Sequence, residues 1–165
     1  MANVLCREFL EELESEVASS RKCLEKIPES LFNWKPHERS MEMGYLASLV
    51  AGIPRWITFM IEKGVIDLSS FGRDGSKSSG DLVKQFDQNL EGVRKALQNA
   101  NDESLSEPFT LKNQDQVLFS SPKRESIRQA INHLVHHRGQ LTVYMRLNNI
   151  PVPSIYGPSA DDRVF

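Results

Sequence analysis

The segment INHLVHHRGQLTVY, residues 131–144, holds three of the four histidines of the chain. Its apolar residues recur at the spacing of one face of an α-helix, as in Ile131, Leu134 and Leu141. Ser121 and Pro122 precede it as a candidate N-cap and first-turn proline. The pattern predicts a long helix that runs to about Asn148 and places several histidines on a helix with an apolar face to bury.

The same periodicity predicts three further helices. They cover residues 4 to about 26, about 41 to 63 and about 79 to 99, with Ser40 and Ser79 as candidate N-caps and Gly64 as a stop signal. Pro54 lies inside the second helix and is expected to kink it. The Ser- and Gly-rich residues 68–80 are expected to form a linker.

Residues 107–121, EPFTLKNQDQVLFSS, have short alternating runs around a polar turn, which predicts a small β-hairpin between the third and fourth helices. Four amphipathic helices of this length bury their apolar faces most simply against each other. The expected fold is therefore all-α, an antiparallel four-helix bundle with this hairpin. A chain of 165 residues fits one domain, residues 1–165.

Composition and charge exclude several classes of partner. The chain is 39% apolar, with a formal net charge of -2, so it has no general positive field for nucleic acid. The N-terminus lacks the basic start and apolar stretch of a secretory signal, and no uninterrupted apolar run has the length of a membrane span. We expect a cytoplasmic protein that contacts neither nucleic acid nor membrane.

The two cysteines, Cys6 and Cys23, are expected to lie on the first helix. At ~1.5 Å of rise per residue they would be about 25 Å apart, too far for a disulfide. Neither has a recognisable base nearby in the sequence, so both are interpreted as packing residues. The glutamates of this helix, Glu11, Glu12, Glu14 and Glu16, are interpreted as a solvated face.

His133 and His137 are four residues apart, so their imidazoles project from one face of the helix, one turn apart. Helical metal sites use this spacing, and Gln140 and Tyr144 continue the polar stripe. The alternative is that both rings are satisfied by hydrogen bonds inside the bundle or are exposed at its end, since two ligands are fewer than the three of a catalytic zinc site. His136 points about 100° away, toward solvent or an interface.

Two segments, GYLASLVAGIPRW (44–56) and INHLVHHRGQLTVYMRLNNIPVP (131–153), resemble the DinB-like, or YfiT-like, family. The order of elements and the tail PVPSIYGPSADD (151–162) extend the resemblance over nearly the whole chain, and H-x-x-x-H-R-G-Q is its most specific part. The resemblance implies a four-helix bundle, commonly a homodimer, in which three histidines hold a divalent metal such as zinc or nickel. Some members resemble thiol-dependent transferases.

Carried over residue by residue, the resemblance assigns metal ligation to His133 and His137. The third histidine usually comes from the second helix, in a pattern like L-A-x-H-x-A, and the matching position here is Leu49. Leucine has no lone pair to offer a metal, and no general base or other catalytic residue can be assigned. A water molecule, a bound acid or a side chain of a dimer partner would have to complete the site.

Two functions are therefore open. The first is a metal-dependent enzyme, a thiol transferase or hydrolase acting on a small-molecule substrate in a cleft between the second and fourth helices. The second is a non-catalytic relative that keeps the bundle, the dimer surface and a small-ligand pocket after losing the metal. A role in binding a regulatory protein partner has no positive support. Apolar residues in and after the second helix are candidates for a dimer interface, namely Trp56, Phe59 and Phe71.

Overall fold

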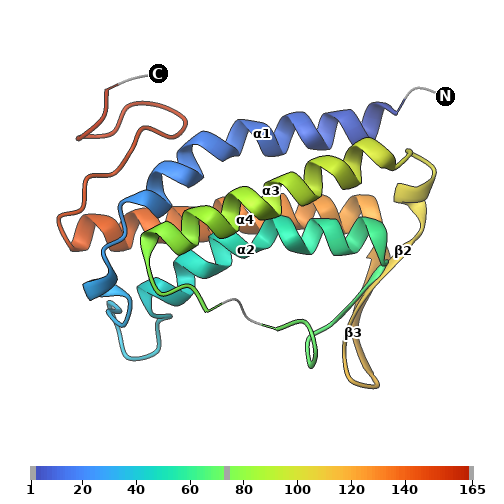
Figure 1. Ribbon diagram of the computed structural model, residues 1–165, viewed down its shortest axis with the longest axis horizontal. Helices are drawn as coiled ribbons and strands as arrows, with labels where there is room; N and C mark the ends of the chain where they lie inside the picture. The colour runs from blue at the N-terminus through green and yellow to red at the C-terminus, as the bar shows by residue number, and fades with distance from the viewer. Residues whose placement is uncertain (1–2, 73–74, 164–165) are drawn as a thin grey trace.

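The computed structural model describes residues 3–72 and 75–163. Four long helices make up most of it and confirm the four predicted from the sequence: α1 (Val4–Glu25), α2 (Met43–Glu62), α3 (Ser79–Asn99) and α4 (Lys123–Leu147). Two single turns of 3-10 helix, η1 (Glu29–Leu31) and η2 (Ser104–Ser106), lie in the connections. The apolar faces of the long helices meet in one buried core (Figure 1).

The helices do not alternate in direction along the chain. Figure 1 shows α1 and α4 running one way and α2 and α3 running the other. Helix α2 packs against α3 and α4, whereas α1 packs mainly against α3 and α4. The predicted antiparallel arrangement therefore holds for α2 beside α4 but not for α2 beside α3, because both α2 and α3 begin at the same end of the bundle.

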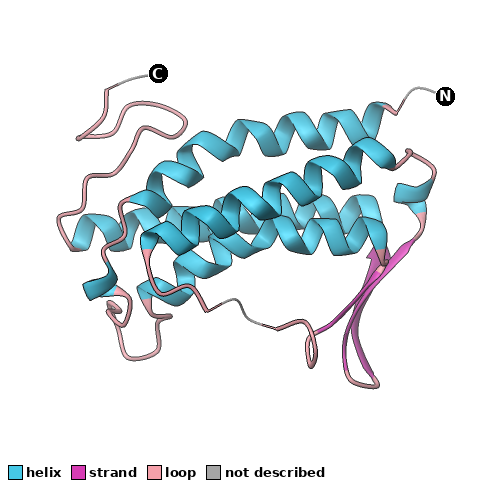
Figure 2. Ribbon diagram, viewed as in Figure 1, coloured by secondary structure: helices cyan, strands magenta, loops and turns pink. Residues whose placement is uncertain are grey.

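A small sheet lies at one end of the bundle (Figure 2). Strands β2 (Pro108–Asn113) and β3 (Gln116–Pro122) pair antiparallel and form the predicted hairpin. A third strand, β1 (Val65–Asp67), pairs parallel with β2, so the sheet is mixed and has the order β1-β2-β3. The sequence analysis did not predict β1, because three residues directly after a helix stop carry too little periodicity to indicate a strand.

Asp67 joins the end of β1 to the turn of the hairpin. Its Oδ1 accepts hydrogen bonds from the backbone N–H of Gln114 and of Ser69, each at 3.0 Å. Together with the Ser69 hydroxyl, these donors lower the pKa of Asp67 to about 2. Gln114 has a φ of 54° in the two-residue turn, so the hydrogen bond to Asp67 helps to hold an uncommon backbone conformation.

The starts of the helices differ in detail from those expected. Ser78, not Ser79, caps α3, because its hydroxyl accepts from the backbone N–H of Asp81 at 3.0 Å. Ser121 does not cap α4, since Pro122 still belongs to β3 and the helix begins at Lys123. Strand β3 thus continues into α4 without an intervening loop, and this fixes the hairpin to the helix that carries the histidines.

Helix α2 also begins without the expected cap at Ser40. The backbone N–H groups of Met43 and Gly44 instead donate to the carbonyls of Trp34 and Phe32, at 2.8 and 2.9 Å. Gly44 has no side chain to obstruct this contact, because a Cβ there would lie 2.8 Å from the Phe32 ring. The loop before α2 is thereby packed directly onto the first turn of the helix. Gly64, with a φ of 64°, ends α2 as predicted.

Helix α2 is long and apolar enough to span a membrane by length and composition, contrary to the expectation that no segment would be. Half of its apolar window is buried against the rest of the protein. A helix that packs between two others in a bundle is apolar on most of its surface for that reason. The packing of α2 against both α3 and α4 accounts for its apolar composition.

Candidate functional site

A groove of about 450 Å³ lies between α2, α4 and the sheet. Its apolar side comprises Ile53, Trp56 and Met60 of α2 and Phe109, Leu111 and Phe119 of the hairpin. Its α4 side comprises Ser126, Gln129, Ala130 and His133. An apolar concavity with a few convergent polar groups has the general character of a small-molecule site, and its volume lies within the range of roughly 300–1,000 Å³ that is typical of such sites.

The two histidines predicted as metal ligands lie next to each other at the edge of this groove. The ring centroids of His133 and His137 are 4.3 Å apart. His137 is buried and contacts the Oε1 atom of Gln140 through Nδ1, at 2.8 Å. Because an amide oxygen can only accept, the tautomer that fits this contact carries its proton on Nδ1 and leaves the lone pair of Nε2 free. Gln140 therefore orients the ring as the outer partner of a metal-bound histidine does.

His133 faces the groove from α4 and is more exposed than His137. Its pKa lies below the ordinary value for histidine, first because the ring is partly withdrawn from water and then because His137 and His136 would add positive charge nearby. A neutral imidazole is the form that accepts a hydrogen bond or binds a metal. His136 is exposed, as predicted.

Leu49 lies on the same face of α2 as the groove, one turn before Ile53. Helices α2 and α4 are neighbours that run in opposite directions (Figure 1). Moving one turn back along α2, from Ile53 to Leu49, therefore corresponds to moving one turn forward along α4, from His133 to His137. The position that the family resemblance assigns to a third histidine is thus level with the histidine pair.

The side chains present do not complete a three-ligand metal site. Within residues 3–72 and 75–163, no group of three or more His, Cys, Asp and Glu side chains is gathered closely enough to hold a metal ion. The third position is a hydrocarbon, and two imidazoles alone leave a divalent metal short of the three protein ligands of a catalytic zinc site. The donor set thus fits two of the three positions, and no metal-dependent step follows from it.

Arg138, next to the histidine pair in sequence, is a central structural residue that the sequence analysis missed. Its side chain is 1% exposed, and its guanidinium lies 2.5 Å from the carboxylate of Glu16 on α1. It also donates to the hydroxyls of Ser19, Ser20 and Tyr156, at 2.7, 3.2 and 2.9 Å. The Tyr156 hydroxyl in turn donates to Glu16, at 3.0 Å. This network joins α4, α1 and the C-terminal tail.

A pattern in the sequence could have indicated this network. Arg138 falls four residues after Leu134 and three before Leu141, on the apolar stripe of α4 rather than opposite it. Glu16 falls three residues after Leu13 on α1 and is buried, so the interpretation of all four glutamates as a solvated face was wrong for this residue. A charge of each sign on two core-facing stripes indicates a buried ion pair.

The three aromatic residues expected at a dimer interface contact each other within the chain. The Phe71 ring lies 5.1 Å from Trp56 and 5.0 Å from Phe59, both edge-to-face. The guanidinium of Arg55 lies over the Phe71 ring at 4.5 Å. Trp56 also lines the groove, so this cluster supports one wall of the candidate site.

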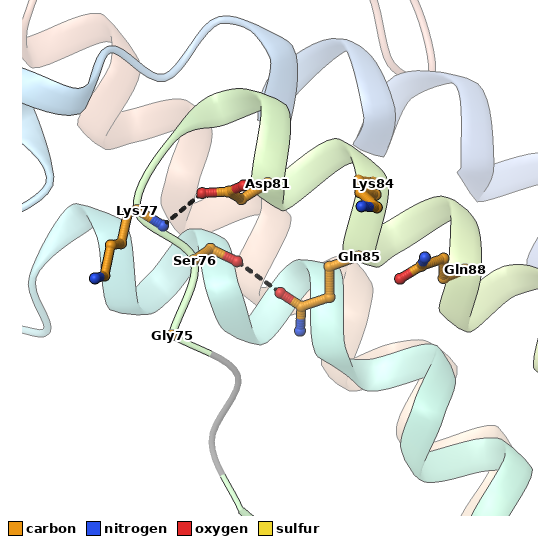
Figure 3. A pocket seen from close by; sticks show the side chains of 7 residues that line it. All are labelled: Gly75, Ser76, Lys77, Asp81, Lys84, Gln85 and Gln88. Carbon is orange, nitrogen blue, oxygen red and sulfur yellow. Dashed lines mark hydrogen bonds between the residues drawn. The ribbon is translucent and has the colours of Figure 1, made fainter.

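A second hollow, of about 350 Å³, lies between residues 75–77 and α3 (Figure 3). Two bonds join its lining residues: the Ser76 hydroxyl donates to Gln85 at 2.7 Å, and the backbone N–H of Lys77 donates to Asp81 at 3.1 Å. None of the residues that line this hollow has an aliphatic or aromatic side chain, so it offers little apolar surface to a ligand. The groove beside His133 is therefore the better candidate site.

Cys6 and Cys23 are 3% and 0% exposed, which confirms that both thiols pack in the core. Burial raises the pKa of each thiol to about 11, and a hydrogen bond to Asp102 adds to the effect at Cys6.

We expect the native protein to react with a thiol reagent such as 5,5′-dithiobis(2-nitrobenzoate) at pH 8 at least a hundredfold more slowly than the same protein in urea. Rapid reaction of either thiol in the native protein would contradict this placement.

Solved structures share this arrangement of four helices with a small sheet at one end. A DinB-like protein (YjoA) from Bacillus subtilis superposes with a TM-score of 0.69 at 20% identity, covering 95% of this chain and 99% of that one. A DinB-like protein from Bacillus cereus ATCC 10987 gives a TM-score of 0.70 at 22% identity, covering 91% and 97%. Identities this low show a common fold.

The sequence itself shows the family. The sequence model that describes the DinB family matches residues 1–163, so this chain belongs to the DinB family. A curated relative, an uncharacterized protein YrdA of Bacillus subtilis (strain 168), is 53% identical over 32 residues. That match spans 19% of each protein, so the chain covers about a fifth of the relative's length.

Proposed function

We propose that this DinB-family protein binds a small molecule in the groove between α2, α4 and the hairpin, with His133 among its hydrogen-bonding groups. One observation carries the proposal: an apolar groove of about 450 Å³ is lined on a single side by polar residues, including one of the two family histidines. The proposal takes up the non-catalytic alternative, because it requires no third metal ligand.

The experiment compares binding in two matched variants. Gln129 is an exposed residue on the α4 side of the groove, so a Gln129→Trp substitution obstructs the site without disturbing the core. Gln98→Trp makes the same change at an exposed position of α3 that does not line the groove. Saturation-transfer NMR with a chemically diverse set of fragments would detect weak ligands of the wild type and of both variants.

We expect fragments that bind the wild type and the Gln98→Trp variant to lose at least four fifths of their saturation signal with Gln129→Trp. Binding that survives Gln129→Trp would place the site elsewhere. A set with no binders at all would remove the support for a small-molecule function.

A metal-dependent enzyme is the second candidate, and the geometry of His137 favours it specifically. The tautomer that bonds to Gln140 through Nδ1 leaves the lone pair of Nε2 for a metal, beside the ring of His133. This candidate needs a third donor from a bound substrate or from a second copy of the chain. Binding of zinc or nickel to the wild type at nanomolar concentration, and its loss in His137→Ala, would favour the enzyme.

A further inference from the structure

The residues that line the groove indicate which chemical class of ligand it accepts. Of the ten described residues that form its wall, none is an aspartate, glutamate, lysine or arginine. Six are aliphatic or aromatic residues of α2 and the hairpin, and Trp56, Phe109 and Phe119 supply three rings. A charged ligand would lose its hydration here without gaining an opposite charge from the wall, which makes its binding unfavourable.

The polar groups are confined to one wall. Gln129 and His133 are four residues apart on α4, so their side chains lie one above the other along the groove, with Ser126 a further turn down. The amide of Gln129 and the imidazole of His133 each offer both a donor and an acceptor, whereas Ser126 is 2% exposed and its hydroxyl already bonds to that of Ser121 at 2.8 Å. The amide and the imidazole match a single uncharged hydroxyl, carbonyl or amide on the ligand.

We propose that the ligand is an uncharged, ring-containing small molecule whose apolar body packs against Trp56, Phe109 and Phe119 and whose single polar group bonds to both Gln129 and His133. The inference rests on the proposed small-molecule function and narrows it to a class. Aromatic side chains favour a flat apolar partner, because rings pack edge-to-face or offset against one another. The polar wall then sets the orientation of that partner.

Three probes of nearly equal size and different charge test this class. They are 2-naphthylmethanol, 2-naphthoate and 2-naphthylmethylammonium, which are neutral, anionic and cationic at pH 7.5. Isothermal titration calorimetry of each probe with the wild-type protein gives three affinities under one condition. We expect the neutral alcohol to bind at least tenfold more tightly than either ion. Gln129→Leu should weaken its binding at least threefold, whereas Gln98→Leu, on the exposed face of α3, should leave it unchanged.

The outcomes separate this inference from the function on which it rests. Binding of the anion or the cation as tightly as the alcohol, with all binding abolished by Gln129→Trp, would overturn the ligand class and leave the site in place. Failure of all three probes would count against both proposals. If in addition Trp56→Ala turned a dimer into monomers in sedimentation velocity, a second copy of the chain would be the occupant of the groove.

Discussion

Replacing Arg138 by methionine lowers the free energy of unfolding by roughly 3–5 kcal/mol, because it leaves the carboxylate of Glu16 buried without its counter-charge. The guanidinium lies 2.5 Å from that carboxylate, and the Arg138 side chain is 1% exposed. The hydroxyls of Ser19 and Ser20 lose their donor as well. Urea denaturation followed by circular dichroism at 222 nm measures the change.

Arg146 provides the matched control on the same helix. It pairs with Asp161 at 2.5 Å, but its side chain is 50% exposed, so Arg146→Met should cost less than about 1 kcal/mol. The double substitution Glu16→Leu with Arg138→Met should recover much of the loss, since it removes both charges from the core. Equal costs for Arg138→Met and Arg146→Met would show that the buried network does not hold the fold together.

Leu49→His creates a third imidazole level with the histidine pair and should raise zinc affinity by roughly two orders of magnitude. Structural zinc sites with four ligands bind the metal with a free energy of about 10–16 kcal/mol, which is roughly 3 kcal/mol for each ligand. A gain of that size raises the affinity about a hundredfold. The position is half-buried on the face of α2 that bears Ile53, so the new ring points toward α4. Competition for zinc with a chromophoric chelator measures the zinc affinity of the wild type and of the Leu49→His variant.

Two further variants make the result specific to this site. Leu49→His combined with His137→Ala should return the zinc affinity to the level of the wild type. Leu68→His adds a histidine to an exposed position beyond β1 and should change nothing. If Leu49→His binds zinc no better than Leu68→His, then Leu49 does not lie level with His133 and His137.

The helices were predictable because their apolar residues recur over five to seven turns. All four lie within two residues of the expected bounds. The hairpin was also predictable, because alternating runs flank a polar turn at residues 113–116. The parallel direction of α2 and α3 was not, since it depends on the end of the bundle at which α3 begins, and local periodicity carries no information on that.

The candidate site was only partly predictable. The spacing of His133 and His137 indicated that they share a face, and the 4.3 Å between their rings agrees with it. A small-molecule cleft between the second and fourth helices was expected, but the part of its wall that the hairpin forms was not, because no local pattern indicates how three separate segments meet. Ser79 was one residue from the true cap, because either of two adjacent serines satisfies the same pattern.

The most direct test of the groove as a ligand site uses the two tryptophans of the chain, each with an indole N–H signal in a ¹⁵N–¹H NMR spectrum. Trp56 lines the groove, whereas Trp34 packs edge-to-face on Tyr144 at 5.5 Å and serves as an internal control. Trp34→Phe assigns the two signals. On titration with 2-naphthylmethanol, the Trp56 signal should shift and saturate while the Trp34 signal stays in place; a Trp56 signal that does not move would contradict ligand binding in this groove.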